Sequence, residues 1–107
     1  MTHKYNKLVR DRIPEIIAQQ GDVPEYEILD DASYYAALNK KLQEELDEYF
    51  QDYSVEELAD IVEVIYAIVN HQGKSVSDFE QIRLKKHDKR GGFDKKIALI
   101  EVASKET

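Results

Sequence analysis

Residues 41–63 hold two clusters of acidic side chains whose spacing suits the binding of a divalent cation. The two clusters, separated by a Tyr53-Ser54 break, are Glu44, Glu45 and Glu48, then Glu56, Glu57 and Asp60. Each contains a pair of carboxylates three residues apart, which places the pair one turn apart on one side of a helix. Carboxylate oxygens are the ligands that Mg²⁺ and Mn²⁺ prefer. The spacing therefore predicts a metal site that both helices share.

The first cluster lies on a helix predicted from about residues 31–33 to Tyr53. At about 100° per residue, one face of this helix carries an apolar stripe made of Tyr35, Leu38, Leu42, Leu46 and Tyr49. Glu45 falls about 20° from Leu38, at the edge of the stripe, and Glu48 follows about 60° further round. Both carboxylates are therefore expected beside the buried face.

The second cluster opens a helix predicted from Ser54 to about Gln72-Gly73. Its apolar residues cover an arc of roughly 200°, with Glu57 inside the arc and Asp60 at its border. Ser54 and Glu57 also match a capping box, in which the glutamate side chain would accept a hydrogen bond from the Ser54 backbone N–H. Because Glu57 cannot fully serve both purposes, we favour a metal-ligand role for it. Glu63 falls on the polar side.

A buried carboxylate without a partner costs several kcal/mol, so it is normally protonated, paired or metal-bound. Few basic residues lie nearby in the sequence, which favours the metal. We expect the ligands to be Glu45, Glu48, Glu57 and Asp60. Glu44 and Glu45 are the catalytic candidates, with Glu44 able to orient or deprotonate water. The alternative is that both clusters are solvated faces of two acidic helices.

The two clusters resemble the EExxE…ExxD signature of the all-α nucleoside triphosphate pyrophosphatases, a superfamily that includes MazG and phosphoribosyl-ATP pyrophosphatase. Residues 5–14 (YNKLVRDRIP) and 89–93 (KRGGF) resemble the opening and closing motifs of small MazG-like proteins. The resemblance extends over about residues 4–100. It implies Mg²⁺-dependent pyrophosphohydrolase chemistry and a helical dimer or tetramer, and it leaves the substrate open.

Basic residues gather at the two ends of the chain. Residues 21–80 carry 16 acidic and three basic side chains, whereas residues 81–107 carry four acidic and eight basic ones. The candidates for neutralising substrate phosphate are Lys7, Arg10, Arg12, Arg83, Lys86, Lys89 and Arg90. The alternatives are an exposed charged lead-in before the first helix and favourable charges at a helix C-terminus. The net charge of −7 argues against non-specific nucleic-acid binding.

The length of 107 residues predicts one domain with a modest core. We expect an all-α bundle of about four helices with an antiparallel central pair, completed by a homodimer or a dimer of dimers. Shorter helices are expected over residues 13–20 and 77–90, and residues 97–102 form either a strand or a final helical turn. No apolar run approaches the roughly 20 residues that span a bilayer, so we expect no membrane contact and a cytoplasmic location.

The expected function is a Mg²⁺-dependent pyrophosphohydrolase, with Mn²⁺ as the alternative metal. It would cleave the α–β phosphate linkage of a nucleotide to a monophosphate and pyrophosphate. Two rivals stay open: hydrolysis of phosphoribosyl-ATP in histidine biosynthesis, and a non-catalytic helical module for metal binding or dimerisation.

Overall fold

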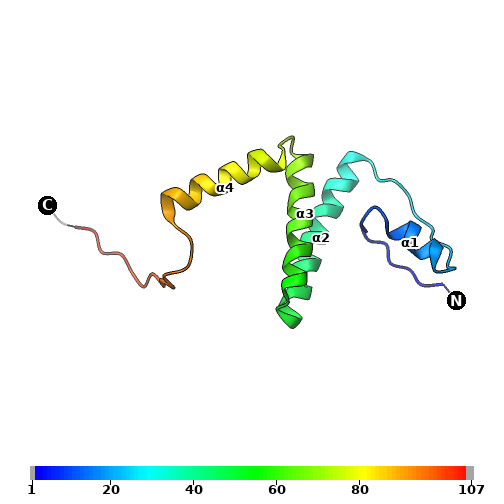
Figure 1. Cartoon of the computed structure of the whole chain (residues 1–107), viewed down its shortest axis with the longest axis horizontal. Helices are drawn as coiled ribbons and strands as arrows, with labels where there is room; N and C mark the ends of the chain where they lie inside the picture. The colour runs from blue at the N-terminus through cyan, green and yellow to red at the C-terminus, as the bar shows by residue number, and fades with distance from the viewer. Residues whose placement is uncertain (1, 106–107) are drawn as a thin grey trace. The chain divides into compact units, whose positions relative to one another are not determined.

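Four helices and no strand make up the regular structure of residues 2–105, the part of the chain that this computed structural model describes. The helices are α1 (Ile13–Gln19), α2 (Asp31–Asp52), α3 (Val55–His71) and α4 (Val76–Arg90), coloured in chain order in Figure 1. The all-α class predicted from the sequence is confirmed. None of these described helices is both long enough and apolar enough to cross a membrane.

The chain divides into two compact units, Met1–Val76 and Ser77–Thr107, which we describe separately. The first unit contains the pair of helices that bears the acidic clusters, and the second contains nearly all of α4. The single-domain organisation expected from the length stays a prediction.

Helix α2 begins at a side-chain cap and ends at a residue with a left-handed backbone conformation. The Ser33 backbone N–H donates to Asp30 Oδ1 at 2.8 Å, which makes Asp30 the N-cap. At the other end Tyr53 adopts a left-handed conformation with φ 55°, which turns the chain out of the helix. Residues 53 and 54 are the whole connection to α3, so the two acidic clusters are carried by consecutive helices that a short link joins.

Helix α3 begins where the capping motif predicted, since the Glu57 backbone N–H donates to Ser54 Oγ at 3.2 Å. The second hydrogen bond of a capping box, from the Ser54 backbone N–H to the Glu57 side chain, is absent from this described turn. The Ser54 backbone N–H donates instead to Asp52 Oδ1 at 3.2 Å. The carboxylate of Glu57 therefore does not cap the Ser54 backbone N–H, and the ligand role favoured for it stays a prediction.

Helices α2 and α3 pack side by side (Figure 1). The buried apolar side chains of residues 2–105 all come from this contact: Leu38, Ile61 and Val64. Near the start of α2, the Tyr35 ring stacks on His71 with centroids 4.8 Å apart. Gln72 Nε2 also donates to the Tyr35 hydroxyl at 3.2 Å. These contacts fix α3 against α2 and thereby fix the relative position of the two acidic pairs.

The apolar arc of α3 is broader than the surface that α2 covers. Val55, Leu58 and Val62 belong to the arc and remain 75%, 43% and 42% exposed. A helix with an arc near 200° needs more than one partner helix to bury it. The exposure of Leu58 and Val62 differs from the inward position predicted for both.

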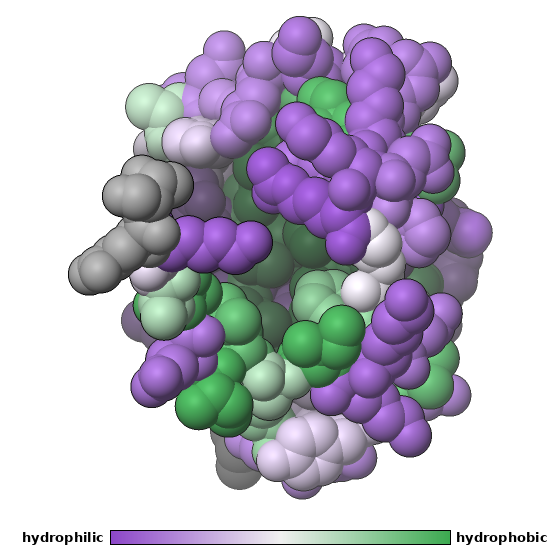
Figure 2. All heavy atoms as spheres, turned by 90° about the vertical axis from the view of Figure 1, so that its left-hand side faces the viewer, coloured by the Kyte–Doolittle hydropathy of each residue, from purple (hydrophilic) through white to green (hydrophobic). Residues whose placement is uncertain are grey.

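Within the described residues, the second unit is helical only over α4, which starts at Val76, one residue before the start predicted at residue 77. Residues 97–102 are neither strand nor helix, so both alternatives left open for them were wrong. Ile97, Leu99 and Ile100 are exposed there, and so is Phe93. A strand needs a neighbouring strand to complete its hydrogen bonds, and residues 2–105 contain none. Figure 2 shows hydrophobic side chains at the surface among hydrophilic ones.

Candidate functional site

Three of the four predicted ligands meet between α2 and α3. One carboxylate oxygen from each of Glu45, Glu57 and Asp60 lies within 4.8 Å of the other two. Glu45 comes from α2, and the other two residues come from consecutive turns of α3. The inward phasing read from the sequence is therefore matched by the positions of these side chains.

Two oxygens of this acidic cluster (Glu45, Glu57 and Asp60) are buried without a partner. Oε2 of Glu45 and Oε2 of Glu57 are inaccessible to solvent and, within residues 2–105, accept no hydrogen bond. Glu45 is only 6% exposed, which is rare for a glutamate. Buried carboxylate oxygens normally have a hydrogen-bond, ionic or metal partner. The donor set, three carboxylates of which two have a buried oxygen without a partner, fits a hard divalent cation.

The pKa of Glu57 is raised above its ordinary value of 4.5, first because burial removes hydration and then because negative charges surround it. The largest of the charge effects comes from Glu48, followed by Asp60 and Glu45. Glu48 is exposed and is not among the three residues whose oxygens converge. The charge of Glu48 nevertheless contributes to the raised pKa of Glu57. The convergence predicted for four ligands is therefore found for three of them, and Glu48 is the exception.

Two basic residues contact the acidic cluster, which corrects the expectation that it has almost no basic partners. Lys41 Nζ lies 3.3 Å from Glu45 Oε1 and 3.8 Å from Glu44 Oε2. Arg10 Nη2 donates to Asp60 Oδ1 at 2.7 Å. The first pair was visible in the sequence, because residues four apart on a helix are neighbours. The second pair links residues 50 positions apart and has no local signal.

The Lys41 contact divides the roles of the two Glu45 oxygens. Oε1 is paired with Lys41, whereas Oε2 is buried and free. A carboxylate held at one oxygen presents the other as a single ligand atom. Lys41 thus holds Glu45 at one oxygen and leaves the other without a partner.

A cavity of about 230 Å³ adjoins the acidic cluster. Residues 8–11 form one wall, and α2 and α3 form the others. Lys41, Glu45 and Asp60 line the cavity, together with the apolar side chains of Leu38 and Val64. Such a mixture of apolar walls and a few charged groups is typical of small-molecule sites.

Glu63 also lines this cavity, although the sequence placed it on the polar side of α3. It is exposed and lies one turn after Asp60, so the side of the helix that faces the cavity is wider than the phasing suggested.

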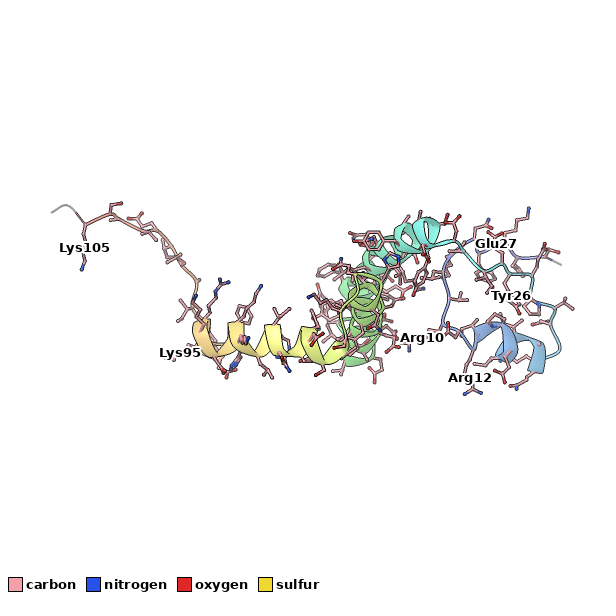
Figure 3. All side chains as sticks on the ribbon, turned by 90° about the horizontal axis from the view of Figure 1, so that it is seen from above. Arg10, Arg12, Tyr26, Glu27, Lys95 and Lys105 are labelled. Carbon is pink, nitrogen blue, oxygen red and sulfur yellow. The ribbon has the colours of Figure 1, made fainter. Side chains whose placement is uncertain are left out.

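The predicted phosphate-binding residues fall into two groups. In the first unit Lys7 is exposed, Arg12 Nε lies 3.5 Å from Glu15 Oε2, and Arg10 alone of the three reaches the acidic cluster. Figure 3 shows Arg10 pointing towards α2 and α3, whereas Arg12 points away. The others lie exposed on α4 in the second unit: Arg83, Lys86, Lys89 and Arg90. Arg83 Nε there donates to Glu80 Oε2 at 2.7 Å. A phosphate role for all seven stays a prediction.

The comparisons with known proteins reach only part of the chain. An uncharacterized protein of Mycolicibacterium smegmatis is 52% identical over 42 residues, which is 39% of this chain and 43% of that protein. The matched region is thus less than half the length of that relative. No family model matches the chain, and no solved structure matches it either.

Removing the Lys41 charge is expected to destabilise the metal-free fold. In Lys41→Met, Glu45 keeps its buried position but loses the partner of Oε1, and a buried acceptor left without a partner costs about 1–3 kcal/mol. Urea unfolding in EDTA would measure the loss. Lys40→Met is the matched control, because Lys40 is exposed on the same helix. Equal stabilities of the two variants would contradict the pairing, and Glu45→Gln should recover part of the loss in Lys41→Met.

Proposed function

We propose that this protein is a Mg²⁺-dependent nucleotide pyrophosphohydrolase that cleaves the α–β phosphate linkage of a nucleoside triphosphate or a related nucleotide. The observation that carries the proposal is the convergence of Glu45, Glu57 and Asp60 with two buried, unpartnered carboxylate oxygens. The resemblance of the two acidic clusters and of residues 5–14 and 89–93 to MazG-like pyrophosphatases adds the reaction class.

In this proposal each acid has a distinct role. Glu45, Glu57 and Asp60 hold the cation, and Glu48 adds negative charge at the rim. Glu44 orients or deprotonates the attacking water, since it neighbours Glu45 and its Oε2 is 3.8 Å from Lys41. A bound Mg²⁺ supplies charge neutralisation and polarisation of the phosphate oxygens. Mn²⁺ has similar ligand preferences and is the second candidate.

In this proposal Arg10 completes the site by facing the anionic substrate. Arg10 lies at the cavity beside the acidic cluster, and its planar guanidinium matches the geometry of phosphate oxygens. The cavity of about 230 Å³ is smaller than sites for drug-sized molecules, so it would receive one part of a nucleotide rather than the whole.

The experiment that tests this function measures pyrophosphate release from a panel of nucleoside triphosphates and phosphoribosyl-ATP, with Mg²⁺ and with EDTA. Release that requires Mg²⁺ supports the proposal, and selective cleavage of phosphoribosyl-ATP would assign the protein to histidine biosynthesis. Metal binding without cleavage of any nucleotide would favour the non-catalytic module.

We also propose that the helices form an antiparallel pair completed by a second copy, as a homodimer or a dimer of dimers in the cytoplasm. The exposed part of the α3 arc supports this assembly, because Val55, Leu58 and Val62 repeat at helical spacing on its surface. Light scattering at micromolar concentration is expected to give two or four times the chain mass of 12.4 kDa. A mass of one chain would contradict the assembly.

A further inference from the structure

Arg10 holds a carboxylate that the proposed metal site requires. Its Nη2 donates to Asp60 Oδ1 at 2.7 Å, and Asp60 is one of the three residues whose oxygens converge. Arg10 belongs to residues 8–11, which we call the N-terminal segment and which forms a wall of the cavity beside the acidic cluster. The contact is partly exposed, with the Arg10 and Asp60 side chains at 56% and 40%, so it can open without moving a core residue.

We propose that Arg10 is an exchangeable cation, paired with Asp60 when the site holds no metal and with substrate phosphate when it does. The N-terminal segment would then be released by the metal and closed again by the nucleotide. This inference rests on the proposed function, since it takes the substrate to be a phosphate ester bound together with a divalent cation.

The charges around the site explain why the exchange should occur. Without metal, the Arg10 guanidinium balances one of the carboxylates at the acidic cluster, and Lys41 balances another. A divalent cation on Asp60 would lie close to the guanidinium, and like charges at such separations repel. A phosphate held at the cation offers the displaced guanidinium a new anionic partner, which it can bind through two parallel hydrogen bonds.

A second observation indicates that the cluster is built to receive a ligand. Glu45 is more than nine-tenths buried, and its Oε2 is inaccessible to solvent and has no hydrogen-bond partner in residues 2–105. One of its two carboxylate oxygens lies within 4.8 Å of an oxygen of Glu57 and of Asp60. Lys41 occupies only Oε1. Arg10 and Lys41 therefore neutralise the cluster incompletely, and an oxygen remains available for a cation while both pairs are in place.

The first experiment compares Arg10→Gln with the parent in two binding measurements. Titration with Mn²⁺ alone is expected to give roughly two- to fivefold tighter binding in Arg10→Gln, because the competing ion pair is of the exposed kind and worth at most about 1 kcal/mol. Titration of the Mn²⁺-loaded proteins with inorganic triphosphate is expected to give roughly tenfold weaker binding or more, since a charged hydrogen bond to phosphate is lost. The two affinities move in opposite directions.

Lys4→Gln is the matched control for this comparison. It removes the same unit charge from the exposed residues that precede α1, so it reproduces any long-range effect of net charge. If Lys4→Gln tightens Mn²⁺ binding as much as Arg10→Gln does, the Asp60 contact is not what competes and the exchange is wrong. Unchanged triphosphate binding in Arg10→Gln would overturn the transfer to phosphate.

The second experiment uses the unaltered chain of 107 residues, so its result does not depend on whether a variant folds. Trypsin cleaves after Arg10, and mass spectrometry can measure this cleavage relative to cleavage after the exposed Lys4. Mg²⁺ alone is expected to raise the ratio severalfold, and Mg²⁺ with triphosphate is expected to lower it below the metal-free value. A ratio that Mg²⁺ leaves unchanged would contradict the release of the N-terminal segment.

Failure of this inference can be told apart from failure of the proposed function. Opposite shifts in Mn²⁺ and triphosphate affinity without hydrolysis of any nucleotide would leave the exchange standing and reject the enzyme. Metal-dependent hydrolysis with equal Mn²⁺ affinity in the parent and Arg10→Gln would support the enzyme and reject the exchange. Absence of Mn²⁺ binding by the parent would reject both, because both need a metal at the acidic cluster.

Discussion

Glu45→Gln and Asp60→Asn are each expected to lower Mg²⁺-dependent pyrophosphate release by roughly a hundredfold or more. Each substitution removes one of the three converging carboxylates. A divalent cation at this position would provide several kcal/mol of charge stabilisation in the transition state, and each 1.36 kcal/mol lost costs about a factor of ten in rate. Initial rates at saturating nucleotide and a range of Mg²⁺ concentrations would show whether excess metal restores part of the activity.

The controls for this pair are Asp47→Asn and Glu56→Gln. Asp47 Oδ1 accepts from Gln43 Nε2 on the surface of α2, and Glu56 is exposed in the first turn of α3. Both variants should keep turnover within a factor of about two, the range of ordinary surface substitutions. Glu63→Gln, suggested as a control by the helical phasing, is unsuitable because Glu63 lines the cavity. Parent-like activity of Glu45→Gln or Asp60→Asn would reject the ligand assignment.

Glu57→Gln is expected to melt at or above the parent temperature in EDTA, yet to gain much less from Mg²⁺. The parent should gain about 2.7 kcal/mol at 100 times the dissociation constant, which corresponds to roughly 10 °C or more for a chain of this size. The variant lacks one ligand, so its gain should be only a small part of that. Melting curves of both proteins with EDTA and with Mg²⁺ measure the two quantities together.

The raised pKa of Glu57 explains why Glu57→Gln should melt no lower than the parent in EDTA. Burial and neighbouring negative charges raise it above 4.5, so the folded protein binds this proton more tightly than the unfolded chain does. The resulting contribution to stability is present below pH 4.5 and is lost as the pH rises through the folded pKa. At pH 7 the ionised group therefore destabilises the metal-free fold, and a neutral amide relieves it.

The same reasoning predicts how the comparison changes with pH. The advantage of Glu57→Gln in EDTA should shrink as the pH falls towards 4.5, because the parent glutamate then becomes neutral as well. A variant that is strongly destabilised in EDTA and still shows the full Mg²⁺ gain would identify Glu57 as a structural residue of the α3 start.

The parts of the site that the sequence predicts are those that depend on local rules. Helical phasing alone brings Glu45, Glu57 and Asp60 to facing sides of α2 and α3. The start of α3 is equally local, since Ser54 caps it through a hydrogen bond that spans three residues. Lys41 belongs with these features, because its pairing with Glu45 follows the ordinary i, i+4 rule.

The features that the sequence does not predict depend on distant or missing partners. Arg10 meets Asp60 across 50 residues, from a segment that has no hydrophobic periodicity. Leu58 and Val62 are apolar like Ile61, but α2 is too narrow to cover all three, and only Ile61 is buried. Residues 97–102 have a composition that suits a strand, but residues 2–105 provide no strand beside them.

The two-residue link between α2 and α3 makes the spacing of the acids as informative as their identity. Tyr53 turns the chain and Ser54 caps the next helix, so the link has no additional residue that could absorb a change in length. Inserting or deleting one residue there would disrupt the turn at Tyr53 and the cap at Ser54, and would thereby disturb how Glu57 and Asp60 face Glu45. Homologues that keep this site should therefore tolerate substitutions in the link far better than changes in its length.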